Sequence, residues 1–376
     1  MAQLKDYVIV QPKSKIKAGE GLIKGEYKFF TSSNTQTKWL NQFQYNKPAL
    51  IFGTGGMASV HYCDTPFSTS TDCIVMYAKD NLNLEYVYRY LESHMYILEN
   101  GFKGVGLKHI SKEYILSISI PEVDLCQQES LITSTRKIDE IICARQNQLA
   151  KVDELVKSRF VELFGNLDSN DKNWDELALG SVCEQVKRYP TFCNMEYLER
   201  GIRVIRIGNI LFDGYMDTND DNYVFVYEDA NKDYPDTVIE KNDIVMAVRG
   251  DGSAAKRIGI ITEEKLIGAN ISPNLIRIKA NGNFVLPMFL FHYLTGEVGQ
   301  KRLDSYVNKT AKKNIAAKDI VKVLTPVPPI ELQKEYIAFV KQINKSKLAI
   351  QQSLKKLEAL QKALMQKYFG RGEKCE

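Results

Sequence analysis

The sequence predicts an α+β protein in which two β-rich domains are separated by a long antiparallel two-helix coiled coil, with a pseudo-twofold internal repeat. Two observations predict this class. The 376-residue chain contains two long helix-like segments with similar beginnings and ends, and a stretch of short β-type runs precedes each of them. The repeat period is about 205 residues, far longer than the roughly 20–50 residues of a solenoid unit, so a duplicated domain plus helix is the simpler interpretation.

Each long segment has a proline-led acidic start and a Phe-Gly stop. The run Pro-Glu-Val-Asp-Leu at 121–125 compares with Pro-Pro-Ile-Glu-Leu at 328–332, and Glu-Leu-Phe-Gly at 162–165 compares with Lys-Tyr-Phe-Gly at 367–370. Between these ends, apolar residues alternate at spacings of four and three, which is the pattern of a coiled-coil seam. The predicted seam residues are Ile138, Ile142, Leu149, Val152 and Val156 in the first segment and Ile350, Leu354, Leu357 and Leu364 in the second.

The length of these segments indicates that they pair with each other. About forty residues of helix span roughly 60 Å, whereas the usual globular helix has about 11–12 residues. One such helix cannot bury its apolar stripe on a small β-rich domain, but two can bury their stripes together, so we expect an antiparallel pair. Arg145, Lys347 and Gln361 occupy seam positions, where polar residues commonly fix register and orientation.

Short β-branched or aromatic runs bounded by turn residues predict strands in both halves. They lie at 27–31, 49–53 and 73–77 in the first half, and at 203–207, 222–227, 243–248, 257–262 and 274–278 in the second. A short aromatic helix is predicted next in each half, at 84–91 and 287–294, and the second half carries an insertion of roughly twenty residues between its first strands. The expected domains are 1–120 and 168–326, and the expected helices are 121–167 and 327–376.

Composition excludes several classes of protein. The formal net charge is only +4, so no global basic field indicates nucleic acid, although a local basic face remains open. The seven cysteines form no Cys-x-x-Cys pair and are odd in number, which argues against a disulfide framework or a zinc ribbon. The N-terminus lacks the build of a signal peptide, and no apolar run is long enough to span a bilayer. We therefore expect a cytoplasmic protein with no membrane partner.

Three stretches resemble a known family. They are Gly-Glu-Tyr-Lys-Phe-Phe-Thr-Ser-Ser-Asn at 25–34, Phe-Lys-Gly-Val-Gly-Leu-Lys-His-Ile at 102–110 running into Ile120-Pro121, and Ala-Lys-Lys-Asn-Ile at 311–315 running into Pro-Val-Pro-Pro-Ile-Glu-Leu-Gln at 326–333. In this order, and over essentially the whole chain, they are similar to the specificity subunits of type I restriction–modification systems. The first domain is somewhat short for that pattern, which leaves open whether it is a complete reader.

The resemblance implies a function without catalysis by this chain. Each β-rich domain would be a target recognition domain that reads one half of a bipartite, asymmetric site in double-stranded DNA. The helices would set the gap and dock two methyltransferase (modification) subunits, which would methylate adenine with S-adenosylmethionine as their own cofactor. Restriction subunits could join them. No catalytic residue, metal or bound cofactor is expected in this chain.

Side chains that follow strands are the candidates for DNA contact, because arginine and asparagine can pair with base edges and lysines can contact phosphate. In the first domain they are Thr31, Ser32, Ser33, Asn34, Thr54, Gly55, Gly56, Lys103, Lys108 and His109. In the second they are Arg206, Asn209, Arg249, Ser253, Lys256, Arg257, Asn308, Lys309, Lys312 and Lys313. The glycines would let the backbone approach the duplex closely.

Other functions have weaker support. Phe-Lys-Gly-Val-Gly at 102–106 fits the Phe-x-Gly-x-Gly loop of adenine methyltransferases, but the Asn-Pro-Pro-Tyr/Phe run that should accompany it is absent. Asp236 with Glu263 and Glu264 loosely spells a metal-dependent nuclease site, although acidic residues on loops are common. A protein–protein scaffold without sequence-specific DNA binding, with the coiled coil as its purpose, is the remaining alternative.

Overall fold

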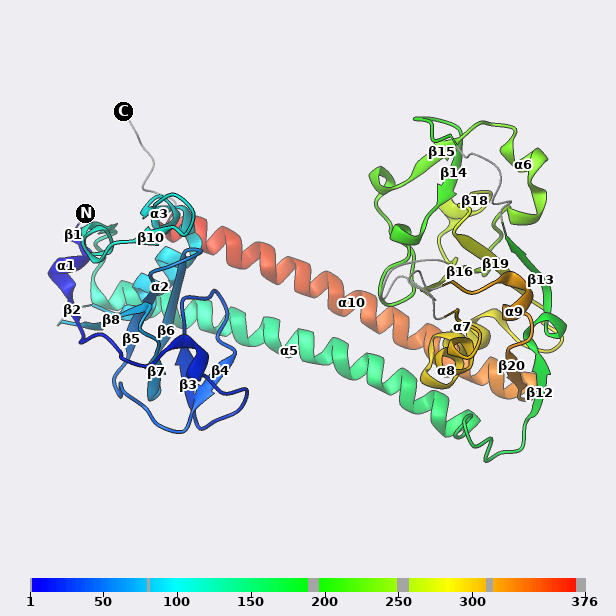
Figure 1. Cartoon of the computed structure of the whole chain (residues 1–376), viewed down its shortest axis with the longest axis horizontal. Helices are drawn as coiled ribbons and strands as arrows, with labels where there is room; N and C mark the ends of the chain where they lie inside the picture. Colours follow the sequence, from blue (N-terminus) through cyan, green and yellow to red (C-terminus); the bar gives the residue numbers. More distant parts are fainter. Residues whose placement is uncertain (1, 80–81, 189–195, 249–256, 309–313, 370–376) are drawn as a thin grey trace. The chain divides into compact units, whose positions relative to one another are not determined.

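The structure is a computed structural model that describes residues 2–79, 82–188, 196–248, 257–308 and 314–369 (Figure 1). The chain divides into two compact units. Unit 1 comprises Met1–Leu149 together with Ala349–Glu376, and unit 2 comprises Ala150–Leu348. Each unit therefore contains one β-rich domain and a part of both long helices, and the units are described separately below.

The two long helices match the repeat in the sequence. Helix α5 spans Leu125–Phe164 and helix α10 spans Ile330–Phe369, so both have 40 residues. At the end of α5, Gly165 has a φ of +75° and its N–H donates to the Val161 carbonyl oxygen at 2.8 Å. A left-handed residue at this position is the usual way to end a helix, and glycine adopts it without steric cost. The Phe-Gly stop thus has a physical cause at the end of α5.

A buried glutamine fixes the start of each long helix. The Gln128 side chain donates to the Val123 carbonyl oxygen at 2.9 Å and accepts a hydrogen bond from the Asn83 backbone N–H, just before helix α2 (Leu84–Ser93), at 2.9 Å. Gln333 donates to the Pro328 carbonyl oxygen at 2.8 Å and accepts a hydrogen bond from the Leu286 backbone N–H, just before helix α7 (Pro287–Thr295), at 2.7 Å. Each glutamine therefore ties its long helix to the short aromatic helix of the same unit.

These glutamines correct the alignment of the repeat. Because Val123 and Pro328 accept equivalent hydrogen bonds, Pro121 corresponds to Pro326. The match of Pro121 with Pro328 proposed from the sequence is wrong by two residues. The similar residue types of the two runs favoured that match, whereas the buried hydrogen bonds determine where each helix begins.

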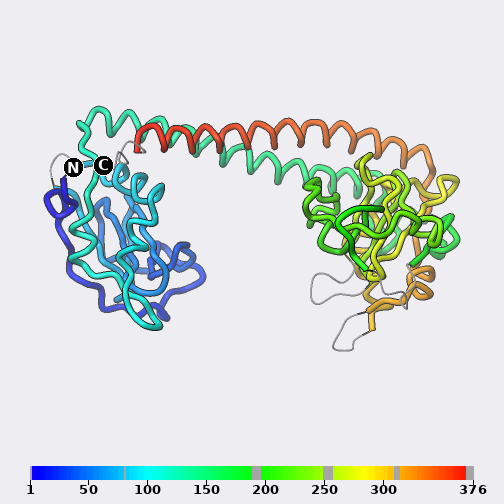
Figure 2. The backbone as a smooth tube through the Cα atoms, turned by 90° about the horizontal axis from the view of Figure 1, so that it is seen from above, coloured from blue at the N-terminus to red at the C-terminus, as the bar shows by residue number. Residues whose placement is uncertain are grey.

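The helices pair antiparallel within each unit. In unit 1, Gln361 donates to the Asp139 carboxylate at 2.5 Å. In unit 2, Lys347 contacts Asp153 at 3.0 Å and Arg159 is paired with Glu335. The predicted seam residues are all buried or half-buried: Ile138, Ile142, Leu149, Val152, Val156, Ile350, Leu354, Leu357 and Leu364. The predicted coiled coil and α+β class are confirmed, and Figure 2 shows both helices in a second view.

Unit 1 is built from four small sheets. A four-stranded sheet has the order β2-β8-β5-β6, a three-stranded sheet has the order β4-β3-β7, and two pairs are β1-β11 and β9-β10. The strands are β1 (Ala2–Gln3), β2 (Val8–Val10), β3 (Tyr27–Phe30), β4 (Lys38–Leu40), β5 (Ala49–Gly53), β6 (Ser59–Cys63), β7 (Phe67–Thr69), β8 (Cys73–Ala78), β9 (Phe102–Lys103), β10 (His109–Ile110) and β11 (Ser119–Ile120). The short helices are α1 (Leu4–Tyr7), α2 (Leu84–Ser93), α3 (Met95–Glu99) and α4 (Lys112–Ser117).

Unit 2 repeats this topology in its larger sheets. The orders β13-β19-β16-β17 and β15-β14-β18 correspond to the two larger sheets of unit 1, and β12-β20 corresponds to β1-β11. The strands are β12 (Asp175–Ala178), β13 (Cys183–Arg188), β14 (Ile202–Ile205), β15 (Val224–Val226), β16 (Ile244–Ala247), β17 (Ile258–Ile260), β18 (Asn270–Ile271), β19 (Leu275–Ala280) and β20 (Leu324–Val327). The short helices are α6 (Ala230–Asp233), α7 (Pro287–Thr295), α8 (Glu297–Asp304) and α9 (Ala317–Ile320).

The shared topology includes one unusual pairing. In each unit the first strand of the three-stranded sheet pairs antiparallel with the next strand and parallel with a later one, β3 with β7 and β14 with β18. The insertion predicted in the second half also lies here, since β14 and β16 begin at residues 202 and 244 whereas β3 and β5 begin at 27 and 49. Within the described residues, no helix is both long and apolar enough to cross a membrane.

Candidate nucleic-acid interface

Unit 1 gathers three of the predicted loops at one place. The loop after β3 and the loop after β5 are joined by Ser32, whose hydroxyl donates to the Gly55 carbonyl oxygen at 2.6 Å and accepts from the Gly55 N–H at 2.9 Å. The β9–β10 hairpin joins them, because the Gly56 N–H donates to the Lys108 carbonyl oxygen at 3.1 Å. His109 completes the contact with its Nδ1 atom 3.1 Å from the Thr54 carbonyl oxygen.

The predicted polar side chains of this cluster differ in their availability to a ligand. Asn34, Lys103, Lys108 and His109 are exposed, whereas Thr31, Ser32 and Ser33 are half-buried. The hydroxyl of Ser32 is already engaged by Gly55, so it builds the loop arrangement. The lysines and the histidine are therefore the groups of this cluster best placed to meet a phosphate.

His61 supports this loop cluster, although the sequence analysis assigned it no role in binding. Its Nε2 atom lies 2.7 Å from the Ser33 carbonyl oxygen and donates a hydrogen bond to it. Burial lowers the pKa of His61, which keeps the imidazole neutral. Histidine in the middle of a strand carries no signal for such a contact, because the contact depends on how two distant loops meet.

In unit 2, the predicted residues Arg206 and Asn209 have different roles. The Asn209 amide is buried, accepts from the Arg206 backbone N–H at 2.8 Å and donates to the Asn222 carbonyl oxygen at 2.9 Å. Asn209 thus holds the loop together, and both polar atoms of its amide are engaged within the protein. The Arg206 guanidinium lies 5.8 Å from the Tyr197 ring centroid and donates to the same Asn222 oxygen at 3.2 Å.

An exposed aromatic ring joins the predicted residue Arg257. The Arg257 guanidinium lies over the Phe212 ring at 4.7 Å, and that ring is 91% exposed. Such a pair presents a flat apolar face beside a positive charge, a combination that binds stacked bases. Phe212 was missed from the sequence because it lies in the inserted segment, which has no counterpart in the first half.

Most of the remaining candidates of unit 2 lie in two segments outside the described residues. Arg249, Ser253, Lys256, Lys309, Lys312 and Lys313 all lie there. The ends of these segments are nevertheless adjacent, because the Ile315 N–H donates to the Val248 carbonyl oxygen at 3.1 Å. Asn308 is exposed and forms a bridge with Asn314, as Lys103 does with His109 in unit 1. The structure therefore brings together the residues that flank both predicted loops.

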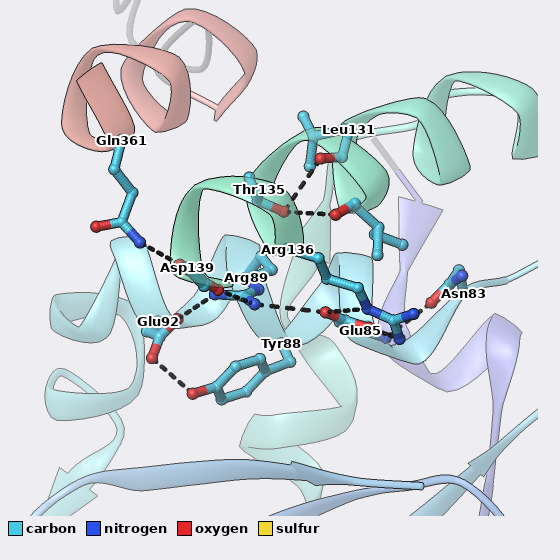
Figure 3. A network of polar contacts seen from close by, with 11 residues as sticks. Asn83, Glu85, Tyr88, Arg89, Glu92, Leu131, Thr135, Arg136, Asp139 and Gln361 are labelled. Carbon is cyan, nitrogen blue, oxygen red and sulfur yellow. Dashed lines mark hydrogen bonds and ion pairs between the residues drawn. The ribbon is translucent and has the colours of Figure 1, made fainter. Parts of the chain in front are cut away.

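A charged network anchors the β-rich domain of unit 1 to the long helices (Figure 3). Arg89 of α2 contacts Asp139 of α5 at 2.5 Å, and Asp139 also accepts from Gln361 of α10. Arg136 donates to the buried Glu85 carboxylate, at 3.1 Å from its Nε atom. Because the groups come from α2, α5 and α10, this network fixes the domain on both helices at once.

Aromatic rings anchor the corresponding place in unit 2. The buried Phe164, at the end of α5, contacts Phe289 of α7 at 4.7 Å and Tyr336 of α10 at 5.5 Å between ring centroids. His292 has its Nδ1 atom 2.8 Å from the Tyr336 hydroxyl, and burial lowers its pKa to about 4. A neutral aromatic cluster therefore holds the second domain.

The acidic residues of the nuclease alternative form ordinary surface ion pairs. Asp236 contacts Lys187 at 2.9 Å, and Glu264 is paired with Lys241. No cluster of three or more metal-ligating side chains occurs in the part of the chain that the structure describes. Asp236 and Glu264 thus make separate contacts with two different lysines.

Two units of one topology, each built on a part of the same two long helices, define a protein with a duplicated β-rich domain on a two-helix coiled coil. The chain matches the type I restriction modification DNA specificity domain over residues 1–152 and 171–361. It therefore belongs to this family, and its function is that of a specificity subunit of a type I restriction–modification system.

Individual relatives are distant in sequence. The type I restriction enzyme EcoBI specificity subunit of Escherichia coli is 23% identical over 378 residues, covering 90% of this chain and 77% of the relative. The MjaVIII specificity subunit of Methanocaldococcus jannaschii is 24% identical over 283 residues, covering 70% of this chain and 64% of the relative.

Solved structures share the fold. The S subunit of a type I restriction–modification system from M. genitalium aligns with a TM-score of 0.62 at 17% identity, covering 97% of this chain and 94% of that one. A chain from a structure on complex assembly and conformational transition of the type I R-M system aligns with a TM-score of 0.56 at 14% identity, covering 99% and 97%.

Proposed function

We propose that the two β-rich domains are target recognition domains that read the two halves of a bipartite, asymmetric site in double-stranded DNA. The observation that carries this proposal is a shared topology with different loop chemistry. Both units present a strand-end loop beside a hairpin base, but unit 1 presents Lys103, Lys108 and His109 whereas unit 2 presents Arg257 stacked on Phe212. Different side chains on equivalent scaffolds read different bases.

The helix pair is the proposed spacer and docking surface. A rigid spacer between two readers fixes the separation of half-sites, as dimer geometry does in other DNA-binding proteins. We propose that two methyltransferase subunits dock on the helices, bind S-adenosylmethionine and methylate adenine, and that restriction subunits can join. In this proposal the chain supplies recognition and no catalytic group.

A protein–protein scaffold without DNA reading is disfavoured. The family match includes both β-rich domains as well as the helices. A scaffold would need the helix pair alone, and it would have no use for the exposed cations Lys103 and Lys108 at the hairpin of unit 1. The loop cluster of unit 1 is thus the feature that separates the two functions.

Modified-base sequencing of the host genome with and without this chain tests the proposal. We expect methylated adenines at one bipartite, asymmetric motif to disappear when the chain is deleted and to return when it is restored. Lys103→Ala with Lys108→Ala should weaken methylation of the motif, whereas Lys232→Ala, at an exposed lysine paired with Asp229 outside the helix pair, should not. Unchanged genomic methylation after deletion, in cells that make the methyltransferase, would contradict the proposal.

A further inference from the structure

The tip of the β9–β10 hairpin carries exposed apolar side chains. Val105 is fully exposed and Leu107 is 70% exposed. Met57 is 71% exposed and lies on the neighbouring loop, since it directly follows Gly56, which is hydrogen-bonded to Lys108. Adjacent exposed apolar residues on a polar surface indicate a contact with a ligand or partner more strongly than scattered single ones.

The backbone holds this tip in a defined conformation. Gly104 has a φ of +135° and Gly106 a φ of +88°, values that other residues rarely adopt. The two strands pair as Lys103 with His109 and Phe102 with Ile110, and the Ile110 N–H donates to the Thr54 carbonyl oxygen at 3.1 Å. The hairpin is therefore fixed at its base, and its glycines present Val105 and Leu107 outward.

Cations surround the apolar tip. Residues 101–112 include three lysines and one histidine and no acidic residue. Lys103, Lys108, His109 and Lys112 are all exposed. A polyanion fits this surface, whereas an apolar protein surface would leave these charges without partners. The combination favours DNA as the ligand of the tip.

We propose that Val105 and Leu107 contact thymine 5-methyl groups in the half-site that the first domain reads. A two-stranded ribbon fits the major groove, where the methyl group is the one apolar feature among the base edges. The flanking lysines would meet phosphates on either side of the groove. This inference rests on the proposed function and adds to it the residues that distinguish one base.

The second domain provides an internal control. The Lys103–His109 pair of unit 1 corresponds to the Asn308–Asn314 bridge of unit 2, so residues 104–108 correspond to 309–313. The sequence there is Lys-Thr-Ala-Lys-Lys, without a large apolar residue. Val105 and Leu107 therefore have no large apolar counterparts in the second domain.

The experiment measures binding of the complete chain, assembled with its methyltransferase subunits, to DNA duplexes. These duplexes carry the motif that modified-base sequencing identifies. Each thymine is replaced in turn by uracil, which removes only the methyl group. Loss of one buried methyl should weaken binding about fourfold at one or two positions of the first half-site. Leu107→Ala should weaken binding to the thymine duplex about tenfold and remove the uracil effect at the thymine that Leu107 contacts.

Two control variants separate this contact from other effects. Lys108→Ala should weaken all duplexes equally, lower the salt dependence and keep the fourfold effect of uracil, as expected for a phosphate contact. Ile267→Ala, at an isoleucine that is 42% exposed in the second domain and outside the helix pair, should change neither affinity nor the uracil effect. Circular dichroism of each variant checks that it is folded.

Two results would overturn the inference. In one, uracil at every first-half position leaves wild-type affinity unchanged. In the other, Leu107→Ala retains the full uracil effect or prevents assembly with the methyltransferase, which would make the tip a protein contact. Failure of the proposed function would look different, because the wild-type complex would then not distinguish the motif from random duplex.

Discussion

Both long helices end with a phenylalanine in the core of a β-rich domain, but the surroundings of the two rings differ. Phe164 lies among the rings of Phe160, Phe289 and Tyr336 in unit 2. Phe369 contacts two tyrosines of α2 in unit 1, at 5.3 and 5.6 Å, and a charged network lies nearby. The repeat has thus kept the position of the anchor and changed the chemistry around it.

The clearest difference occurs at two equivalent positions of the short helices. Arg89 of α2 corresponds to His292 of α7, because Tyr86 and Phe289 make equivalent contacts with the phenylalanines. Arg89 is paired with Asp139, whereas His292 is neutral and bonded to Tyr336. Polar contacts of this kind fix register in helical assemblies. The two junctions therefore distinguish the two ends of the helix pair, which otherwise repeat each other.

The largest effect is expected from Phe164→Ala. Removing a fully buried ring from an aromatic cluster should lower the free energy of unfolding by about 3–5 kcal/mol. Phe369→Ala should cost less, about 2–3 kcal/mol, because the charged network still holds the first domain. Chemical denaturation followed by hydrogen exchange should assign the first loss to unit 2 and the second to unit 1. Equal losses for the two variants would contradict the contrast between the junctions.

A pH effect is expected from His292. Its pKa is lowered from 6.5 to about 4 in the folded state, so the unfolded state binds more protons as the pH falls below 6.5. Stability should therefore fall between pH 6.5 and 4, by at most about 3 kcal/mol, and the effect should be absent above pH 6.5. His292→Gln should remove this component of the pH dependence measured by thermal unfolding. An unchanged pH profile in the variant would show that His292 does not cause it.

A smaller effect is expected at the equivalent position of unit 1. Arg89→Met should lower the free energy of unfolding by about 2 kcal/mol, because Asp139 and the buried Glu85 lose a partner while Arg136 still neutralises Glu85. Arg145→Met is the matched control, since Arg145 donates to Gln148 within its own helix and its loss should change stability by at most about 0.5 kcal/mol. A similar loss in both variants would rule out a special role for the network.

The sequence predicts the repeated and periodic features well. The seam residues follow from a period that the helix itself imposes, so Leu149 and Leu354 are half-buried as expected. The predicted strand at 49–53 coincides with β5, and the other predicted strands differ from the observed ones by one or two residues at their ends. Strands β6 and β7 were missed: β7 has only three residues, whereas the Ser-Val-His-Tyr run of β6 alternates polar and apolar residues and could have indicated a strand.

The candidate interface is predicted less completely. The sequence identifies the loops of unit 1, because glycine, serine and lysine follow recognisable strands there. It does not predict that Asn209 is buried inside its loop or that Phe212 stacks on Arg257, because both depend on the insertion of unit 2. Whether a polar residue faces outward is decided by contacts between loops, which leave no periodic pattern in the chain.

The central claim is that the helices measure a distance between two separate readers. Asp139 opposes Gln361 in unit 1, so the antiparallel register places residues 143–149 opposite 351–357. Deleting both segments removes one heptad from each helix, about 10 Å of spacer or about three base pairs of DNA. Modified-base sequencing of cells that carry this variant should show the same bases in both half-sites with a shorter gap between them. Altered bases with an unchanged gap would contradict the account.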